Sequence, residues 1–171
     1  MLKKIVVGAV LLVVLAGAVF YTNPFGVFGE KIYASVPGNQ APAISAVDIN
    51  GVATDVQFQG GLTVLNFWAT WCPPCKAEMP EFESFYRDNA GKIAFYAINI
   101  QEPPERVKNF LKAEQYTMPI LLDSNGEIAK SYRVNAIPTT IIVDKTGKVV
   151  FRKSGAMSKE ELDKAVALFR Q

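Results

Sequence analysis

The feature that most constrains this chain is a pair of cysteines placed directly after an apolar run. Cys72 and Cys75 are the only cysteines among 171 residues, and they belong to a Trp-Cys-Pro-Pro-Cys segment (71–75) that follows the apolar residues 62–69. Two thiols separated by two residues can form a disulfide in the first turn of a helix. The helix N-terminus also favours a thiolate, because its N–H groups are unpaired and its dipole is positive there. This arrangement is typical of a site that exchanges disulfides.

Other uses of two neighbouring cysteines fit less well. Haem attachment needs a histidine after the second cysteine, and the residue there is Lys76. A structural zinc site needs four ligands, whereas the chain has two cysteines and no histidine. A purely structural bridge across so short a loop would remove little entropy from the unfolded chain. A Cu(I) carrier could use two thiolates alone, so that alternative stays open. We expect no bound metal and no cofactor.

The start of the chain predicts export. Lys3 and Lys4 precede residues 5–21, which carry no charge and as a helix would reach about 26 Å, near the lower limit for crossing a bilayer. The lysines predict a cytoplasmic N-terminus and an extracytoplasmic body on a single-pass anchor. The alternative is a cleaved signal peptide, since residues 16–18 have the small-x-small spacing of a cleavage site.

The predicted organisation has four parts. Residues 1–4 are cytoplasmic, residues 5–22 form the transmembrane signal anchor, and residues 23–42 form a linker rich in Gly, Pro and small residues. Residues 43–171 form one domain, of a size that can hold its own core. The net charge of +2 and the lack of a basic stripe with aromatics give no support for nucleic-acid binding.

The sequence of the domain predicts strands that alternate with helices. We expect a hairpin over 43–56 turning at Asn50-Gly51, buried strands over 62–69 and 92–100, and helices over 73–89 and 104–115. A short strand over 119–122 and a short helix over 127–132 come next. Strands over 139–143 and 149–152 form a second hairpin, and Ser158 with Glu161 predicts a capping box for the last helix. The fold class is α/β, a mixed central sheet flanked by helices.

Three distant segments should meet at one edge of that sheet. Sites form beyond the carboxyl ends of parallel strands, and two such strands lead to Cys72 and to Glu102. The strand from Thr139 runs antiparallel, so its beginning lies at the same edge. That arrangement places Ile137 and Pro138 beside the cysteines.

These residues carry a resemblance to a known family. The segments 67–76 and 137–140, with the cysteine motif in the first and Ile-Pro-Thr-Thr as the second, resemble the thioredoxin-like superfamily. More narrowly, the chain is similar to the membrane-anchored thiol–disulfide oxidoreductases of cytochrome c maturation, the ResA/TlpA type. Four features support that match: the N-terminal anchor, the early hairpin, Asn66-Phe67-Trp68 and the segment 99–102. The similarity covers residues 41–171, and it implies a thioredoxin-like fold with an extra N-terminal β-hairpin.

The resemblance also implies roles for the residues around the motif. The Ile137–Pro138 bond is expected to be cis and to present the backbone of Ile137 to an incoming peptide. Trp71, Pro73 and Pro74 should contact the substrate, with Trp71 on an exposed rim, whereas Trp68 should lie in the core.

Asn66 and Glu102 need a separate comparison. Many thioredoxins carry a proton-relaying aspartate at the position of Asn66, and an asparagine cannot titrate. In the ResA-type group a glutamate from the loop after the next strand is thought to serve instead, and Glu102 matches it. A buried Cys75 needs such a base to become a thiolate. The alternative from the residues alone is a solvated loop glutamate.

The expected activity is reduction of disulfides in partner proteins by Cys72 and Cys75. The resemblance implies apocytochrome c as a substrate and a membrane thiol-transporting protein as the electron donor. One alternative is an oxidase of exported proteins, although such oxidases usually carry a histidine between the cysteines and a large helical insertion. The other is the Cu(I) carrier.

Overall fold

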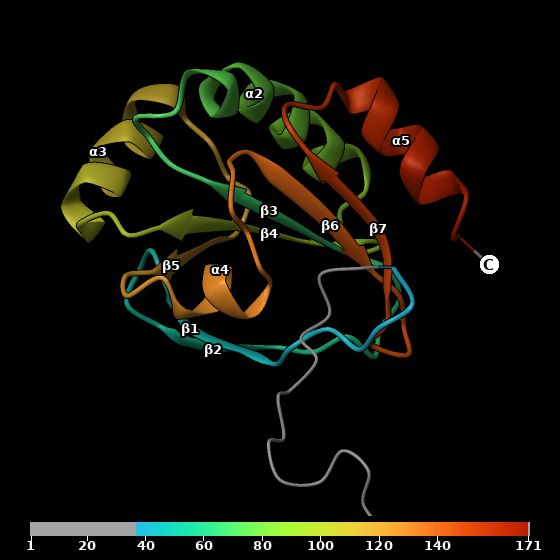
Figure 1. Ribbon diagram of the computed structural model, residues 1–171. Helices are drawn as coiled ribbons and strands as arrows, with labels where there is room; N and C mark the ends of the chain where they lie inside the picture. The colour runs from blue at the N-terminus through green and yellow to red at the C-terminus, as the bar shows by residue number, and fades with distance from the viewer. Residues whose placement is uncertain (1–36, 171) are drawn as a thin grey trace, which may run out of the picture. The chain divides into compact units, whose positions relative to one another are not determined.

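A computed structural model describes residues 37–170 of the chain (Figure 1). These residues form a seven-stranded mixed sheet in the order β2-β1-β5-β4-β3-β6-β7. The strands are β1 (Ile44–Asp48), β2 (Ala53–Val56), β3 (Thr63–Trp68), β4 (Ala94–Ile100), β5 (Ile120–Asp123), β6 (Thr139–Val143) and β7 (Val149–Ser154). The helices are α2 (Pro73–Asp88), α3 (Pro104–Glu114), α4 (Glu127–Ser131) and α5 (Lys159–Ala167).

Strand β3 lies near the middle of the sheet and is buried along its whole length. It pairs in parallel with β4 and antiparallel with β6, with Trp68 opposite Asn99 and Phe67 opposite Thr139. The carboxyl ends of β3 and β4 and the beginning of β6 therefore share one edge of the sheet. The arrangement predicted for that edge is confirmed.

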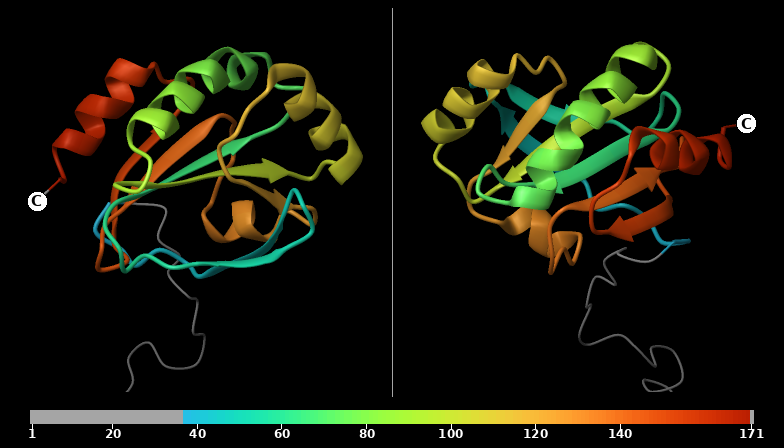
Figure 2. Two further views of the ribbon diagram at one scale, coloured as in Figure 1. Left: turned by 180° about the vertical axis from the view of Figure 1, so that it is seen from behind. Right: turned by 90° about the horizontal axis from the view of Figure 1, so that it is seen from above.

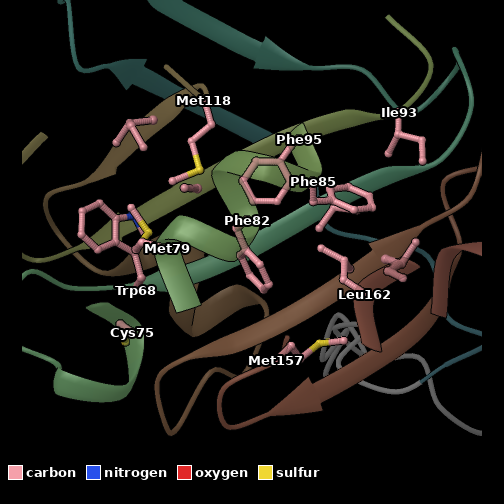
Figure 3. Close-up of a cluster of buried hydrophobic side chains, with 14 of the residues drawn as sticks. Trp68, Cys75, Met79, Phe82, Phe85, Ile93, Phe95, Met118, Met157 and Leu162 are labelled. Atoms are coloured by element: carbon pink, nitrogen blue, oxygen red, sulfur yellow. The ribbon is translucent and has the colours of Figure 1, made fainter. Parts of the chain in front are cut away.

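Helices cover both faces of the sheet, as its apolar strands require. Figures 1 and 2 show α2, α3 and α5 over one face and the short α4 over the other. The larger core lies under the three helices, where Phe82 and Phe95 pack edge to face with ring centroids 5.8 Å apart (Figure 3). The second core lies on the side of α4, where Phe67 packs against Tyr132.

Local sequence signals set most element boundaries. The first hairpin pairs Val47 with Ala53 in antiparallel register across the predicted turn. Helix α5 begins with the predicted capping box, in which Ser158 accepts from the N–H of Glu161 and the Glu161 carboxylate accepts from the N–H of Ser158. The mixed α/β fold with its extra N-terminal hairpin is confirmed.

The last residues of the predicted linker contact the domain. The N–H of Gly38 donates to Val149 O at 2.7 Å, and the N–H of Ala41 donates to Gly147 O at 2.7 Å. The Tyr132 hydroxyl donates to Pro42 O at 2.6 Å. The predicted anchor, residues 5–22, lies outside the described residues. Between residues 37 and 170, no helix combines the length and the apolar character needed to cross a membrane.

Candidate active site

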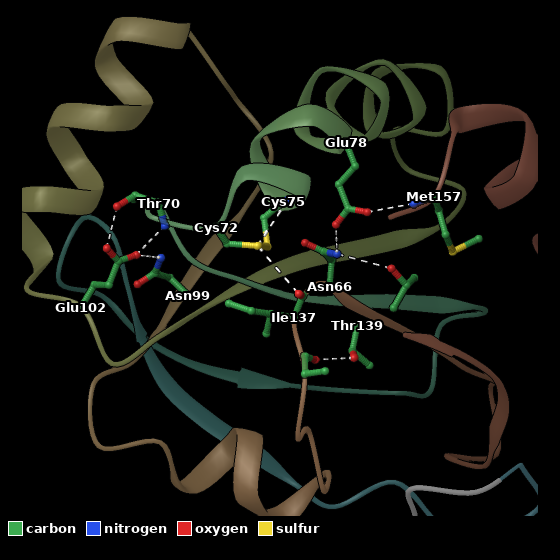
Figure 4. Close-up of a disulfide and its surroundings, with 12 residues drawn as sticks. Asn66, Thr70, Cys72, Cys75, Glu78, Asn99, Glu102, Ile137, Thr139 and Met157 are labelled. Atoms are coloured by element: carbon green, nitrogen blue, oxygen red, sulfur yellow. Dashed lines mark hydrogen bonds between the residues drawn. A yellow bond between two sulfur atoms is a disulfide. The ribbon is translucent and has the colours of Figure 1, made fainter. Parts of the chain in front are cut away.

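The two cysteines form a disulfide at the first turn of α2 (Figure 4). Cys72 is the N-cap residue, and its Sγ accepts from the N–H of Cys75 at 3.3 Å. The two residues after Cys72 are prolines, which suit the first helical turn because its N–H groups have no partner within the helix. Cys75 is fully buried and Cys72 is 3 % exposed. A partner molecule therefore reaches the bridge from the side of Cys72.

A second chain segment lies against Cys72, as the topology predicts. The Ile137–Pro138 peptide bond is cis. The carbonyl oxygen of Ile137 lies 3.8 Å from Cys72 Sγ. Thr139 holds the segment in place, because its hydroxyl donates to Ala136 O at 2.7 Å. The start of β6 therefore forms one wall beside the sulfur.

Apolar side chains on either side of Cys72 in the sequence are exposed. Trp71 is 62 % exposed, and Pro73 and Pro74 are also exposed. Trp68, three residues before Trp71, is fully buried and packs against Phe110 of α3. The expected division between a core tryptophan and a rim tryptophan is confirmed.

Glu102 is buried at the same edge and binds the loop that leads into the cysteines. One carboxylate oxygen accepts from the N–H of Thr70 at 2.6 Å and from Asn99 Nδ2 at 2.8 Å. The other accepts from the Thr70 hydroxyl at 2.6 Å, and Arg106 Nη1 lies 4.0 Å from it. These contacts show a carboxylate that fixes Thr70, two residues before Cys72. Among the described residues, no hydrogen bond joins Glu102 to either cysteine.

Another buried glutamate lies one helical turn beyond Cys75. Glu78 is 2 % exposed, and its carboxylate accepts from Asn66 Nδ2 at 2.8 Å and from the N–H of Met157 at 3.0 Å. Burial raises the pKa of Glu78 from 4.5 to about 7. The bonds from Met157 and Asn66 and the charge of Lys153 act in the opposite direction and are weaker. Glu78 can therefore gain or lose a proton near neutral pH.

Sequence analysis did not single out Glu78. The signal that would find it is its spacing, because Cys75, Glu78, Met79 and Phe82 recur at helical intervals and are all buried on one side of α2. A carboxylate inside such an apolar stripe is unusual, since a buried charge needs specific partners.

Asn66 lies between Glu78 and the bridge in Figure 4 and contacts Glu78. Its Nδ2 donates to Glu78 and, at 3.3 Å, to the hydroxyl of Thr140. Its Oδ1 is buried and has no hydrogen-bond partner among the described residues. Figure 4 shows this oxygen on the side of the amide that faces the bridge. In the disulfide state neither sulfur carries a hydrogen, so the oxygen has no donor there.

Fold and site together define a class of protein. A disulfide at the N-terminus of a helix, next to a cis-proline segment and a buried titratable carboxylate, suits thiol–disulfide exchange. The class is therefore a thiol–disulfide oxidoreductase with a thioredoxin-like fold.

Comparisons with known proteins agree with that class. The family model described as Redoxin matches residues 36–168, and the chain belongs to this family. The thiol-disulfide oxidoreductase ResA of Bacillus cereus is 34% identical over 163 residues, which cover 94% of each chain. The sporulation thiol-disulfide oxidoreductase A of Bacillus subtilis is 37% identical over 129 residues, covering 71% of this chain and 78% of the relative.

A solved structure gives the same result. The crystal structure of StoA from Bacillus subtilis matches with a TM-score of 0.66 and 33% identity, covering 77% of this chain and 98% of StoA. The ResA-type resemblance is thus confirmed. The prediction that the protein is an enzyme of thiol–disulfide exchange is confirmed with it.

Proposed function

We propose that the protein reduces disulfides in extracytoplasmic partner proteins, with apocytochrome c as the leading substrate. The observation that supports exchange at this bridge is a fully buried Cys75 with Glu78, whose pKa is about 7, one helical turn further along α2. A reductase must deprotonate this second thiol in every turnover, and a carboxylate that titrates near neutrality can take that proton. The segment between the cysteines, Pro73-Pro74, also lacks the histidine usual in strong oxidants.

The first step uses the accessible sulfur. Reduced Cys72, as a thiolate at the start of α2, attacks one sulfur of the partner's disulfide. A mixed disulfide forms between Cys72 and the partner, and the partner's other sulfur leaves as a thiolate and takes a proton from water. Trp71, Pro73 and Pro74 contact the partner, and the Ile137 backbone beside the cis-proline binds its chain.

The second step releases the partner. The Cys75 thiol first donates a hydrogen bond to Asn66 Oδ1 and then loses its proton, for which Glu78, one helical turn further along α2, is the proposed acceptor. The Cys75 thiolate then attacks Cys72 Sγ, and the partner's second sulfur leaves as a thiolate that is protonated. The partner has gained two electrons from the enzyme's two sulfurs and two protons from solvent, the enzyme has closed its bridge, and the proton on Glu78 returns to solvent. In this scheme Glu102 fixes Thr70 and so holds the loop that carries Trp71 and Cys72. A second proposed role for Glu102 is proton exchange with Cys75.

The proposed extracytoplasmic compartment determines how the Cys72–Cys75 bridge is re-reduced and where the domain is held. An oxidising exterior leaves the bridge closed, so a membrane thiol-transporting protein must supply electrons. Residues 5–22 are proposed as a retained anchor that holds the domain on the extracytoplasmic side. The intact mass of protein purified from membranes tests this: loss of the first 18 residues would show a cleaved signal peptide.

Trapping of a mixed disulfide tests the reaction. Cys75→Ser should accumulate a covalent, reductant-sensitive complex with the substrate, because nothing resolves the bond at Cys72. Cys72→Ser is the matched control and should trap none. If Cys75→Ser captures no partner in cells, the mechanism is wrong.

The redox potential decides the direction of transfer. A midpoint near that of strong thiol oxidants, about −120 mV, would assign oxidation in place of reduction. Tight, stoichiometric Cu(I) binding by a protein that reduces no disulfide would instead assign copper transport.

A further inference from the structure

The end of the sheet opposite the cysteines carries a group of cations. Lys92 lies just before β4, Lys145 and Lys148 lie in the turn between β6 and β7, and Arg170 follows α5. In Figure 1 these segments lie at the far end of β3 and β4 from the start of α2. We call these four residues the basic end. Three of them, Lys92, Lys145 and Arg170, line one hollow together with the backbone of 60–61.

None of the four cations of the basic end has an acidic side chain within ion-pair distance in the described residues, although the charge of Lys148 contributes to lowering the pKa of Asp144. Within residues 37–170, none of the four takes part in an ion pair, whereas most other ionic contacts join α2, α3 and α5 residues to neighbours. Asp144 is the one acid of the hollow. Its Oδ1 accepts from Thr146 Oγ1 at 2.6 Å, from the N–H of Thr146 at 2.8 Å and from the N–H of Lys148 at 3.1 Å. Asp144 is thus committed to its own turn.

Charge is concentrated at this end of the molecule. Four cations and one acid give the basic end and Asp144 a formal charge of 4 − 1 = +3, and the whole chain carries +2. The rest of the chain therefore sums to −1. An anionic surface would attract this end and not the remainder.

An exposed apolar side chain adjoins the cations. Leu168, at the end of α5, is 75 % exposed, the highest value among the large apolar residues of the described chain. The next residue, Phe169, is half-buried and lines the hollow. Basic side chains around an exposed leucine are typical of surfaces that lie in the headgroup region of a membrane.

The chain also enters the domain at this end. Gly38 and Asn39 exchange backbone hydrogen bonds with Val149, and Ala41 donates to Gly147, next to Lys148. Residues 23–36 separate this point from the proposed anchor, and a segment of that length spans at most about 50 Å when fully extended. The point at which the chain enters the domain therefore adjoins the basic end.

We propose that the basic end docks on anionic phospholipid headgroups, with Lys92, Lys145, Lys148 and Arg170 around the phosphates and Leu168 at the interface. The inference rests on the proposed anchor only for bringing the surface close to lipid. Docking in this orientation points Cys72 and Trp71 away from the bilayer, toward soluble partner proteins, so re-reduction by the membrane donor requires release of the basic end. Each Lys or Arg near an anionic surface changes its binding about fivefold.

The test measures labelling of Lys148 in the full chain. The protein is placed in nanodiscs of phosphatidylcholine alone or of phosphatidylcholine with phosphatidylglycerol, and an amine-reactive label is followed by mass spectrometry. Lys112 on α3, remote from the basic end, is the internal reference. Docking should slow Lys148 labelling relative to Lys112 by roughly fivefold in the anionic discs, and high salt should remove the difference.

Charge-matched variants make the result specific. The triple variant Lys92→Gln, Lys145→Gln, Arg170→Gln should lose the protection. The control Lys108→Gln, Lys112→Gln, Lys130→Gln removes the same charge from α3 and α4 and should keep it, with labelling referred to Lys76. Equal Lys148 labelling in both kinds of disc, or equal protection in the two variants, would overturn the proposal.

A failed anchor gives a different pattern. If the chain does not insert into either disc, the anchor is refuted, and flotation on vesicles of the same two compositions decides the docking surface. Salt-sensitive flotation with phosphatidylglycerol vesicles only would support it, and no flotation would overturn it. Disulfide exchange by the same preparation is measured separately and reports on the proposed reaction alone.

Discussion

Glu78 should make the stability of the domain depend on pH in a way that one substitution removes. Burial raises its pKa from 4.5 to about 7, so the folded protein holds a proton that the unfolded chain releases between these values. The free energy of unfolding therefore falls as the pH rises through this window and is lowest above pH 7. The rise in pKa corresponds to at most about 3 kcal/mol.

Replacement of Glu78 by Gln removes the titration and leaves a similar shape. Gln offers one acceptor where the carboxylate offers two, so either Asn66 Nδ2 or the N–H of Met157 loses its partner. That loss costs about 1–3 kcal/mol at every pH. We expect Glu78→Gln to be less stable than wild type at pH 5 and to approach or exceed it at pH 8.

Urea denaturation of the oxidised protein between pH 5 and pH 8 measures both effects. The difference in unfolding free energy between wild type and Glu78→Gln should change by about 2–3 kcal/mol across this range. The control is Glu81→Gln, an exposed neighbour on the same helix, which should follow the pH dependence of wild type. Parallel curves for Glu78→Gln and wild type would show that burial does not hold a proton on Glu78, and the reasoning would be refuted.

Three further outcomes test the core, a helix cap and the loop before the cysteines. Phe82→Ala opens a cavity beside Phe95 in the larger core and should cost about 3–5 kcal/mol in urea denaturation; a loss under 1 kcal/mol would contradict the packing. Ser158→Ala removes half of the capping box of α5 and should cost about 1 kcal/mol, whereas Ser158→Thr should restore most of it. Glu102→Gln should alter the pH dependence of Cys75 alkylation in the reduced protein if Glu102 exchanges protons with that thiol, and a curve that coincides with wild type would leave Glu102 the single role of fixing Thr70.

The framework of the fold was predictable because its signals are local and strong. Apolar residues on both alternating faces of the run 62–69 indicated that β3 is covered on both sides, and all six of its residues are buried. The meeting of the Cys72 and Ile137 segments followed from strand direction alone, since the ends of β3 and β4 and the beginning of β6 share an edge. Topology of this kind can be read from a sequence once the strand order is guessed.

Side-chain networks were less predictable. Glu78 looks like any charged residue on a helix, and its burial depends on Asn66 and the N–H of Met157, which are distant in sequence. Residues 38–41 look like linker because they are rich in small residues, whereas their contacts with β7 are made by backbone atoms that every residue type carries. In both cases the determining partner comes from another part of the chain, and a one-dimensional pattern does not contain it.

The near-complete burial of the sulfurs has a consequence for the selectivity of the site. Cys75 is fully covered and Cys72 exposes 3 % of its surface. Small thiols and peroxides diffuse everywhere but present no backbone to align along the Ile137 segment, so they have little to hold them at so narrow an opening. A polypeptide can bind the apolar rim and the segment together before any bond changes. In the proposed reaction, the narrow opening therefore favours protein partners over low-molecular-weight thiols and peroxides.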